Sequence, residues 1–278
     1  MSNKKLHERY GPCALVIGAA EGMCAAWAEL LAKEGFDLVL LDLREPELQA
    51  LATKLQSKHG IKAGALRCDL TDLDQVRGAL DHIAGVEIGL VVFNAALAAN
   101  GPWVDSTFED KMRVVAVNVH AVLMVTDALS RPMIERKRGG IVLTSSMAAL
   151  QGAPGQAIYA ATKSFDLILA ESLWGELSPQ GVDVMAFIPG MVRTPNFERS
   201  GANKATSMLF SPVEPAAAVE DALAGLGKGP RVVPGKVWKA MAAASNLMPR
   251  DKLIEAAGER MRGLENQGSL AKAKRKPA

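Results

Sequence analysis

A regular alternation of short apolar runs with amphipathic segments is the feature that most constrains what this chain can fold into. The apolar runs are rich in branched side chains and predict strands, whereas the segments between them carry apolar residues at helical spacing. We expect strands at residues 13–17, 37–41, 63–68, 88–93, 139–146, 182–188 and 231–233, and helices at residues 22–34, 47–59, 72–84, 105–135, 157–177, 214–226 and 237–262. Strands and helices in this order form a parallel sheet covered on both faces. The sequence therefore predicts an α/β fold with a doubly wound parallel sheet.

Composition is consistent with one soluble domain spanning residues 1–278. The chain is 49% hydrophobic and 22% charged, so it can bury a large core, and no repeat or linker divides it. We expect a core over residues 10–235, a helical extension over 236–265 and a disordered basic tail over 266–278. A formal net charge of +2 gives no field that would attract nucleic acid or an anionic membrane.

The location and metal content also follow from simple patterns. The three cysteines and four histidines show no metal-ligand spacing, so we expect reduced thiols and no metal site. The amino terminus is charged and the apolar stretch after it is short and broken by glycine, unlike a signal peptide or a membrane span. These features predict a cytoplasmic protein.

The stretch from Gly139 to Lys163 indicates a reaction. Ser146 stands at the end of an expected strand, and Tyr159 and Lys163 lie four residues apart on one face of the following helix. A phenol titrates near pH ~10, and a neighbouring ammonium lowers that pKa, so Tyr159 could exchange a proton near neutral pH. Ser146 could hold the same substrate oxygen. By itself the Tyr–Lys pair is more typical of a buried Tyr beside a surface Lys. The surrounding motifs therefore decide whether the pair is catalytic.

A strand-to-helix turn at Gly18 and Gly22 is typical of phosphate binding, because glycines let backbone amides approach a pyrophosphate at a helix amino terminus. An ordinary turn explains these residues equally well. Asp42 ends the next strand, where a carboxylate can accept the ribose hydroxyls of NAD, although it could also cap the helix that follows. Asp42 and Glu21 would repel a 2′-phosphate, whereas Arg44 would favour NADP. We expect NAD, with NADP as the alternative.

In this order the motifs resemble those of the short-chain dehydrogenase/reductase family. Ser146, Tyr159 and Lys163 keep the spacing of that family's catalytic Ser, Tyr and Lys. Residues 17–24 resemble its T-G-x-x-x-G-x-G, with Ile17 in place of the Thr and Cys24 in place of the last Gly. The resemblance extends over about residues 10–235.

Details near the amino terminus narrow the resemblance. Tyr10-Gly11 before the first strand and the Glu21-Gly22 turn are similar to the branch that contains bacterial hydroxysteroid dehydrogenases. The family resemblance implies a Rossmann-type sheet and a catalytic Asn118, which would hold a water in a proton relay to Lys163. From the residues alone, Asn118 could equally be an amide bonded to neighbouring backbone.

The resemblance also implies a cofactor site. Two further segments carry it: residues 94–96 stand where the family has N-A-G after a first Asn, and residues 189–194 resemble P-G-x-x-x-T, whose Thr holds the nicotinamide carboxamide. Asp69 would meet the adenine, or serve only as a turn residue. The implied cofactor-binding residues are Gly18, Glu21, Gly22, Met23, Asp42, Asp69, Leu70, Asn94, Ala95, Tyr159, Lys163, Pro189, Gly190, Val192 and Thr194.

The activity implied is hydride transfer between NAD and a secondary alcohol or ketone. Residues 195–212 lack periodicity but carry apolar side chains, which is typical of a lid over a small, apolar substrate; a disordered surface loop is the alternative. NADP-dependent reduction of a steroid or acyl-chain ketone is one alternative. A dinucleotide-binding scaffold or sensor is another, suggested by the departures at Cys24, Phe93 and Ala96.

The helix that carries Tyr159 also predicts self-association. Its side opposite the site is apolar, and an exposed apolar side is typical of an interface. The residues on that side are Ala161, Phe165, Ile168, Leu169 and Leu173. Together with the family resemblance, they predict a homodimer or homotetramer.

Overall fold

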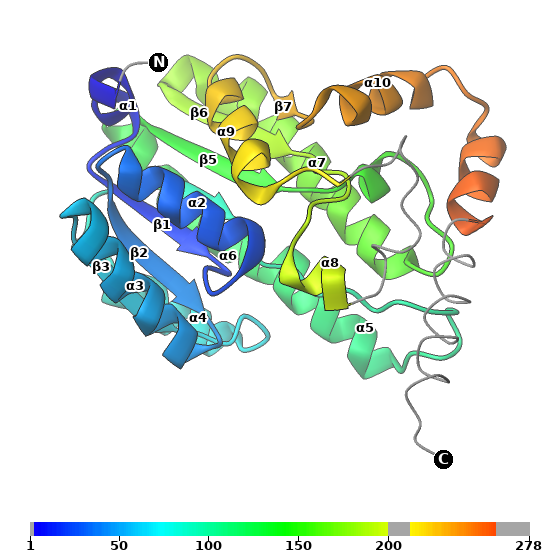
Figure 1. The fold of residues 1–278 in the computed structure, drawn as a ribbon, viewed down its shortest axis with the longest axis horizontal. Helices are drawn as coiled ribbons and strands as arrows, with labels where there is room; N and C mark the ends of the chain where they lie inside the picture. Colours follow the sequence, from blue (N-terminus) through cyan, green and yellow to red (C-terminus); the bar gives the residue numbers. More distant parts are fainter. Residues whose placement is uncertain (1–2, 200–211, 260–278) are drawn as a thin grey trace.

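Seven parallel strands form one sheet at the centre of the protein, of which the computed structural model describes residues 3–199 and 212–259 (Figure 1). The strands are β1 (Cys13–Ile17), β2 (Asp37–Asp42), β3 (Ala63–Arg67), β4 (Ile88–Phe93), β5 (Gly139–Thr144), β6 (Val182–Phe187) and β7 (Arg231–Val232). Their order across the sheet is β3-β2-β1-β4-β5-β6-β7, and every pairing is parallel. The doubly wound sheet is confirmed. The strand order reverses between β1 and β4, and ligands of such sheets bind at the carboxyl ends beside that point.

Helices cover both faces of the sheet (Figure 1). One face packs α2 (Gly22–Lys33), α3 (Glu45–His59) and α9 (Pro215–Gly225) into a core with the alternate side chains of the strands. The other face packs α4 (Leu73–His82), α6 (Ala121–Glu135) and α7 (Ala157–Leu177) into a second core. The central strands are buried on both sides, which is why they read as unbroken apolar runs.

The long helix expected over residues 105–135 is interrupted in its middle. It consists of α5 (Phe108–Val115), a π-helical turn η1 (Ala116–His120) and α6, with the amide of Ala121 bonded to the carbonyl of Ala116. Residues 108–135 are long and apolar enough to cross a membrane by length and composition, but several of their side chains belong to the core beneath the sheet. We interpret them as a core helix. π turns often mark functional sites, and Asn118 stands in this one.

The chain ends differ from expectation. The amino-terminal helix α1 (Asn3–Tyr10) has no counterpart among the predicted elements. The expected continuous helix over 237–262 is α10 (Lys236–Ser245) followed by a separate helical stretch over 250–259. Pro249 lies between them, and a proline in a helix interior removes a backbone hydrogen bond. Of the expected lid, α8 (Pro195–Arg199) is described; residues 200–211 and the basic tail lie outside the described residues.

A polar cluster around the buried carboxylate of Asp183 attaches α1 to the amino-terminal end of the sheet. Arg9 donates two hydrogen bonds to the carboxylate of Asp183, from Nε at 2.5 Å and from a terminal nitrogen at 2.7 Å, and the Tyr10 hydroxyl donates a third at 2.7 Å. The ring of Tyr10 has no exposed surface. A side chain at Gly140 or Gly227 would collide with it, since a Cβ at either position would lie 2.9 Å from a Tyr10 atom.

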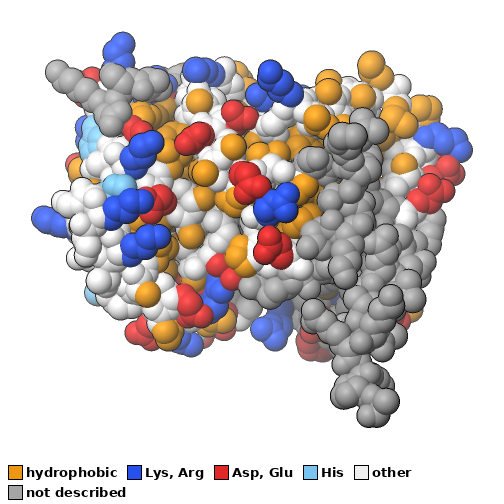
Figure 2. Space-filling view, viewed as in Figure 1, with side chains coloured by type: hydrophobic (Ala, Val, Ile, Leu, Met, Phe, Trp, Pro, Cys, Tyr) orange, Lys and Arg blue, Asp and Glu red, His pale blue; other side chains and the backbone are white. Residues whose placement is uncertain are grey.

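The outer surface has no field of one sign on the face shown in Figure 2, where acidic and basic side chains are interspersed. Hydrophobic side chains gather at the top right of that view, over α10. The exposed apolar residues of α10 and the turn after it include Val237, Leu247 and Met248.

The apolar outer side expected for α7 is narrower than predicted. Phe165, Leu169 and Leu173 are partly buried against the core of their own chain, whereas Ala161 and Ile168 are exposed. The sequence could not separate the two groups, because both lie away from the Tyr159 face and only packing against the neighbouring elements distinguishes them.

Candidate active site

The glycine turn after β1 brings three distant segments together. Gly18 has a φ of +88°, and a Cβ there would lie 2.9 Å from the Cα of Ala95. Gly22 has a φ of +65°, and a Cβ there would lie 3.2 Å from a side-chain carbon of Thr194. Both positions combine a backbone conformation that favours glycine with a close neighbour. The turn, the loop after β4 and the segment at Thr194 therefore meet at one edge of the sheet.

Asp42 holds the shape of the same turn. Its Oδ2 accepts a hydrogen bond from the amide of Ala20 at 3.0 Å, and its Oδ1 accepts one from the amide of Arg44 at 3.0 Å. The Arg44 guanidinium lies 3.0 Å from Glu21 and 3.5 Å from Asp42, so it bridges the two carboxylates. Each oxygen of Asp42 keeps capacity for another donor. Two carboxylates and one half-exposed cation thus stand where the sequence predicts the adenosine ribose.

Lys163 is buried in the segment of residues 139–163, which carries the predicted catalytic residues Ser146, Tyr159 and Lys163 and is called the catalytic segment below. Its ammonium donates to the carbonyl of Thr144 at 2.7 Å and to Oδ2 of Asp166 at 2.9 Å. The hydroxyl of Ser145 donates in turn to the carbonyl of Lys163 at 2.7 Å. These bonds attach α7 to the carboxyl end of β5, which lies two residues before Ser146.

Ser146 and Tyr159 lie beside this junction and are partly exposed. Ser146 caps the short helix η2 (Met147–Leu150), accepting a hydrogen bond from the amide of Ala148 at 3.2 Å. Tyr159 lies one helical turn before Lys163, on the same face of α7. A partly exposed hydroxyl and phenol can both reach a ligand, which a fully buried pair could not.

Asn118 braces the site and is completely buried. Its Oδ1 accepts from the amide of Leu97 at 2.9 Å, and its Nδ2 donates to the carbonyl of Leu97 at 2.9 Å and to the hydroxyl of Thr162 at 3.0 Å. The amide therefore joins the loop after β4 to the residue next to Lys163. These partners are distant in sequence. The Asn118 amide is therefore neither unpaired nor bonded to the backbone of its sequence neighbours.

Asn94 connects the glycine turn to the catalytic segment. Its Oδ1 accepts from the Thr144 hydroxyl at 2.9 Å, and its Nδ2 lies 2.8 Å from the Cys24 sulfur. The Cys24 side chain is buried, and burial raises the pKa of its thiol to about 12. The side chain that replaces a family glycine thus packs inward against Asn94. Phe93 is also buried, while Ala96 is exposed.

The remaining expected cofactor residues have mixed surroundings. One oxygen of Asp69 accepts from the amide and hydroxyl of Thr71, which is the arrangement of a turn residue. Leu70, Pro189 and Val192 are buried, and Met23 is partly exposed. Gly190 lies against Trp238 of α10, because a Cβ there would fall 2.1 Å from the indole ring. Close packing of α10 is therefore a sufficient reason for this glycine.

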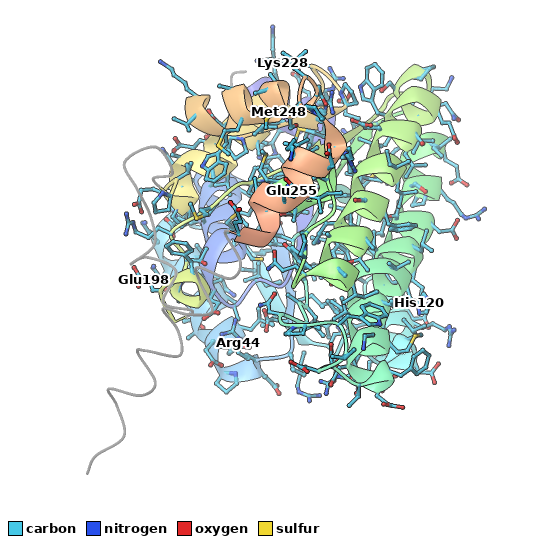
Figure 3. All side chains as sticks on the ribbon, turned by 90° about the vertical axis from the view of Figure 1, so that its right-hand side faces the viewer. Arg44, His120, Glu198, Lys228, Met248 and Glu255 are labelled. Atoms are coloured by element: carbon cyan, nitrogen blue, oxygen red, sulfur yellow. The ribbon has the colours of Figure 1, made fainter. Side chains whose placement is uncertain are left out.

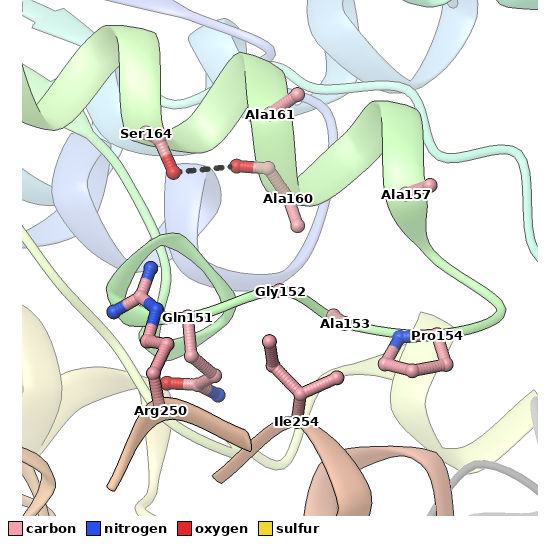
Figure 4. A pocket seen from close by; sticks show the side chains of 10 residues that line it. All are labelled: Gln151, Gly152, Ala153, Pro154, Ala157, Ala160, Ala161, Ser164, Arg250 and Ile254. Atoms are coloured by element: carbon pink, nitrogen blue, oxygen red, sulfur yellow. Dashed lines mark hydrogen bonds between the residues drawn. The ribbon is translucent and has the colours of Figure 1, made fainter.

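Two nearby features do not belong to the catalytic segment. His120 is exposed and lies at the outer edge of the helix layer (Figure 3). A pocket of about 380 Å³ lies between the loop at Gly152, the outer side of α7 at Ala161 and Ser164, and the helical stretch that carries Arg250 and Ile254 (Figure 4). Neither Ser146, Tyr159 nor Lys163 lines it.

Comparison with known proteins places this arrangement in a family. The model of short chain dehydrogenases matches residues 12–205. The chain belongs to the short-chain dehydrogenase/reductase family. As a member of that family it is an NAD(P)-dependent oxidoreductase acting on CH–OH groups.

Individual relatives agree with the family. The chain is 27% identical over 233 residues to a 7beta-hydroxysteroid dehydrogenase of Collinsella aerofaciens, covering 83% of this chain and 89% of that protein. It is 35% identical over 191 residues to oxidoreductase UcpA of Escherichia coli, covering 68% and 72%.

Solved structures give the same result. A structure of a 7beta-hydroxysteroid dehydrogenase superposes with a TM-score of 0.86 at 26% identity, covering 91% of this chain and 98% of that one. A short-chain dehydrogenase from Sphingobium yanoikuyae in complex with NADPH gives a TM-score of 0.74 at 30% identity, covering 85% and 94%. The expected relation to bacterial hydroxysteroid dehydrogenases is confirmed.

Two residues of this region were not among the site residues predicted from the sequence. Asp166 pairs with Lys163, and the spacing of three residues between them was the available signal. Thr162 gave no signal, because its partner Asn118 lies 44 residues away.

Proposed function

We propose that this protein transfers hydride between NAD and a secondary alcohol or ketone, with Tyr159 as the general acid/base. The observation that carries the proposal is the junction of α7 with β5. There a buried ammonium at Lys163 lies one helical turn from the partly exposed Tyr159, and Ser146 follows the end of the strand by two residues.

Each side chain has a separate task in this reaction. The nicotinamide supplies or accepts the hydride when it is bound. Ser146 holds the substrate oxygen by a hydrogen bond, and Tyr159 gives or takes the hydroxyl proton. We assign to Lys163 an electrostatic role, since its ammonium lies on the same face of α7, one helical turn from Tyr159. Asn118 holds the loop at Leu97 against the helix at Thr162 by hydrogen bonds. We also assign to Asn118 the proton relay to Lys163.

The residues at the glycine turn fit a dinucleotide. The glycine turn leads directly into the first turn of α2, whose amino-terminal amides can receive a pyrophosphate. Gly18 and Gly22 keep the backbone free of side chains at the closest approach. We assign the ribose hydroxyls to Asp42, the adenine side to Asp69 and Leu70, and the nicotinamide side to Asn94, Ala95 and the segment from Pro189 to Thr194.

NAD is the cofactor we propose, because Asp42 and Glu21 present two carboxylates where a 2′-phosphate would have to lie. NADP is the second candidate. Arg44 lies between these carboxylates and is accessible, and a related structure is a complex with NADPH.

Binding measurements with Asp42 variants decide between the cofactors. Wild-type protein should bind NAD more tightly than NADP in calorimetric titrations. Asp42→Asn removes the charge but keeps an acceptor for the turn, so NAD affinity should fall and the gap between the cofactors should narrow. Tighter binding of NADP by wild-type protein would show that the assignment of Asp42 is wrong.

The substrate we propose is an apolar secondary alcohol or its ketone, of the hydroxysteroid class. The loop after β4 supports an apolar entrance, since Leu97, Trp103 and Val104 expose apolar surface. That loop lies beside the residues before Tyr159, because the amide of Gly101 donates to the carbonyl of Gly155 at 2.8 Å. Relatives named 7beta-hydroxysteroid dehydrogenase support the same class.

Tyr159→Phe tests the mechanism. The ring remains while the transferable proton is lost, so turnover should fall by about 10²- to 10⁴-fold and NAD affinity should stay within twofold. Turnover is followed by nicotinamide absorbance with hydroxysteroids and simpler secondary alcohols, and affinity by titration of the cofactor. Comparable turnover in this variant would end the proposed role of Tyr159.

We also propose a homodimer or homotetramer formed through the outer sides of α5 to α7. Exposed apolar residues cluster on these helices: Phe108, Met112, Leu123, Ile168 and Trp174. Surface helices of a monomer seldom expose so many large apolar side chains.

A further inference from the structure

The ion pair between Lys163 and Asp166 is buried more deeply than any other ion pair of the described residues. The two side chains are 3% and 2% exposed, and Nζ lies 2.9 Å from Oδ2. They are one helical turn apart on α7. Removing both charges from water is costly, and an apolar pair of similar size is often as stable or more so. Stability alone therefore gives no reason for an ion pair, rather than an apolar pair, at these two positions.

Asp166 serves no described residue other than Lys163. Its Oδ2 accepts from the ammonium, while its Oδ1 is buried without a hydrogen-bond partner in the described part of the chain. A carboxylate that braced the fold would be expected to engage both oxygens, as Asp183 does with Arg9 and Tyr10. Burial raises the pKa of Asp166 to about 6, and the ammonium of Lys163 opposes that rise. The contacts of Asp166 are thus directed at one group.

The ammonium has a defined position before any ligand arrives. It has three N–H donors, of which one goes to the Thr144 carbonyl and one to Asp166. A lysine side chain has much rotational freedom, and two fixed acceptors remove it in advance. The third donor has no partner among the described residues.

We propose that Asp166 is a positioning residue, which holds the Lys163 ammonium against the end of β5 so that its third N–H is kept for the ligand beside Tyr159. This inference rests on the proposed function of Lys163. It assigns to Asp166 no contact with substrate or cofactor.

Kinetics of Asp166→Asn test the proposal. The variant keeps the size of the side chain but loses the charge that holds the ammonium, so we expect kcat to fall about tenfold while the KM for the alcohol stays within twofold. A merely structural residue would not produce this split. Glu255→Gln is the matched control, because Glu255 also pairs with a cation three residues away on its own helical stretch, Lys252, but at the surface. It should leave both constants unchanged.

A double-mutant cycle separates the proposed positioning role of Asp166 from the proposed function of Lys163. If Asp166 acts through Lys163, then Asp166→Asn lowers kcat in the wild-type background and has no further effect in Lys163→Met. A further tenfold loss in that background, or unchanged kcat in Asp166→Asn alone, overturns the role of Asp166 and leaves Lys163 as proposed. Full activity of Lys163→Met would overturn the proposed function itself, and the inference with it.

A spectroscopic measurement keeps the proposal testable if a single variant fails to fold, since each leaves a buried charge unpaired. In ¹⁵N-labelled wild-type protein without cofactor, a held ammonium should give a side-chain lysine resonance protected from solvent exchange. The signal should vanish in Lys163→Met/Asp166→Asn, which removes the charge pair together. Absence of any protected lysine resonance from wild-type protein overturns the proposal.

Discussion

The two tyrosines of this chain should respond in opposite ways to the same substitution. Tyr10→Phe keeps a ring that is fully enclosed and removes only its hydroxyl, which donates to Asp183 at 2.7 Å. A hydrogen bond to a charged group contributes about 1.5–3 kcal/mol. Arg9 still pairs with the carboxylate, so no unpaired charge is created. We expect a loss of about 2 kcal/mol in the free energy of unfolding.

The magnitude is within reach of standard assays. In a chain of this size a loss of 1 kcal/mol lowers the melting temperature by roughly 2–4 °C, so Tyr10→Phe should lower it by about 4–8 °C. Urea unfolding followed by tryptophan fluorescence gives the free energy itself. Turnover below the transition should be unchanged, because Tyr10 lies at the amino-terminal end of the sheet and the site lies at the carboxyl end.

Tyr159→Phe is the matched control. The Tyr159 hydroxyl is hydrogen-bonded to no described residue, and the side chain is partly exposed. The substitution should therefore change the free energy of unfolding by less than about 0.5 kcal/mol. Turnover should fall by about 10²- to 10⁴-fold, as proposed above. The reasoning about Tyr10 is refuted if Tyr10→Phe costs less than about 0.5 kcal/mol, or if it lowers turnover as Tyr159→Phe does.

Three further outcomes follow from the described contacts. Gly18→Ala should weaken NAD binding at least about tenfold, because its Cβ would meet the backbone of Ala95. Gly60→Ala is its control, because Gly60 also has a positive φ but open space around it. It should lower the free energy of unfolding by only about 1–2 kcal/mol and leave NAD binding unchanged in the same titration. Ile168→Glu should lower the mass seen by light scattering, and a wild-type protein that is monomeric at micromolar concentration would contradict the proposed assembly. Because burial raises the pKa of Cys24 to about 12, its thiol should resist iodoacetamide at pH 8 until the protein unfolds, and rapid labelling of native protein would contradict its buried position.

Local patterns were enough to predict the sheet. The central strands β1, β4, β5 and β6 are short runs whose side chains are buried on both faces, and such burial requires consecutive apolar residues in the sequence. The same holds for Tyr159 and Lys163, because residues four apart on a helix share a face whatever surrounds it. The bounds of the helices were predicted less well. The helix expected over 237–262 is broken before residue 250, and Pro249 should have indicated that break.

Contacts between distant segments could not be predicted in this way. Asp183 appears in the sequence as one polar residue within a strand, and only the fold brings Arg9 and Tyr10 to it across more than 170 positions. Gly190 likewise matches a cofactor motif, but the structure gives it a neighbour, Trp238, that would exclude any larger residue. Such pairings depend on how elements pack, which no local pattern records.

The sequence by itself determined which chemical groups this protein carries and at what spacing, since those depend on covalent order and helical period. Only the tertiary structure decided how they are held. Asn118 clamps Leu97 to Thr162, and Lys163 is buried between Thr144 and Asp166. Burial sets the cost of a charge and the strength of its hydrogen bonds, and burial is a property of the folded chain.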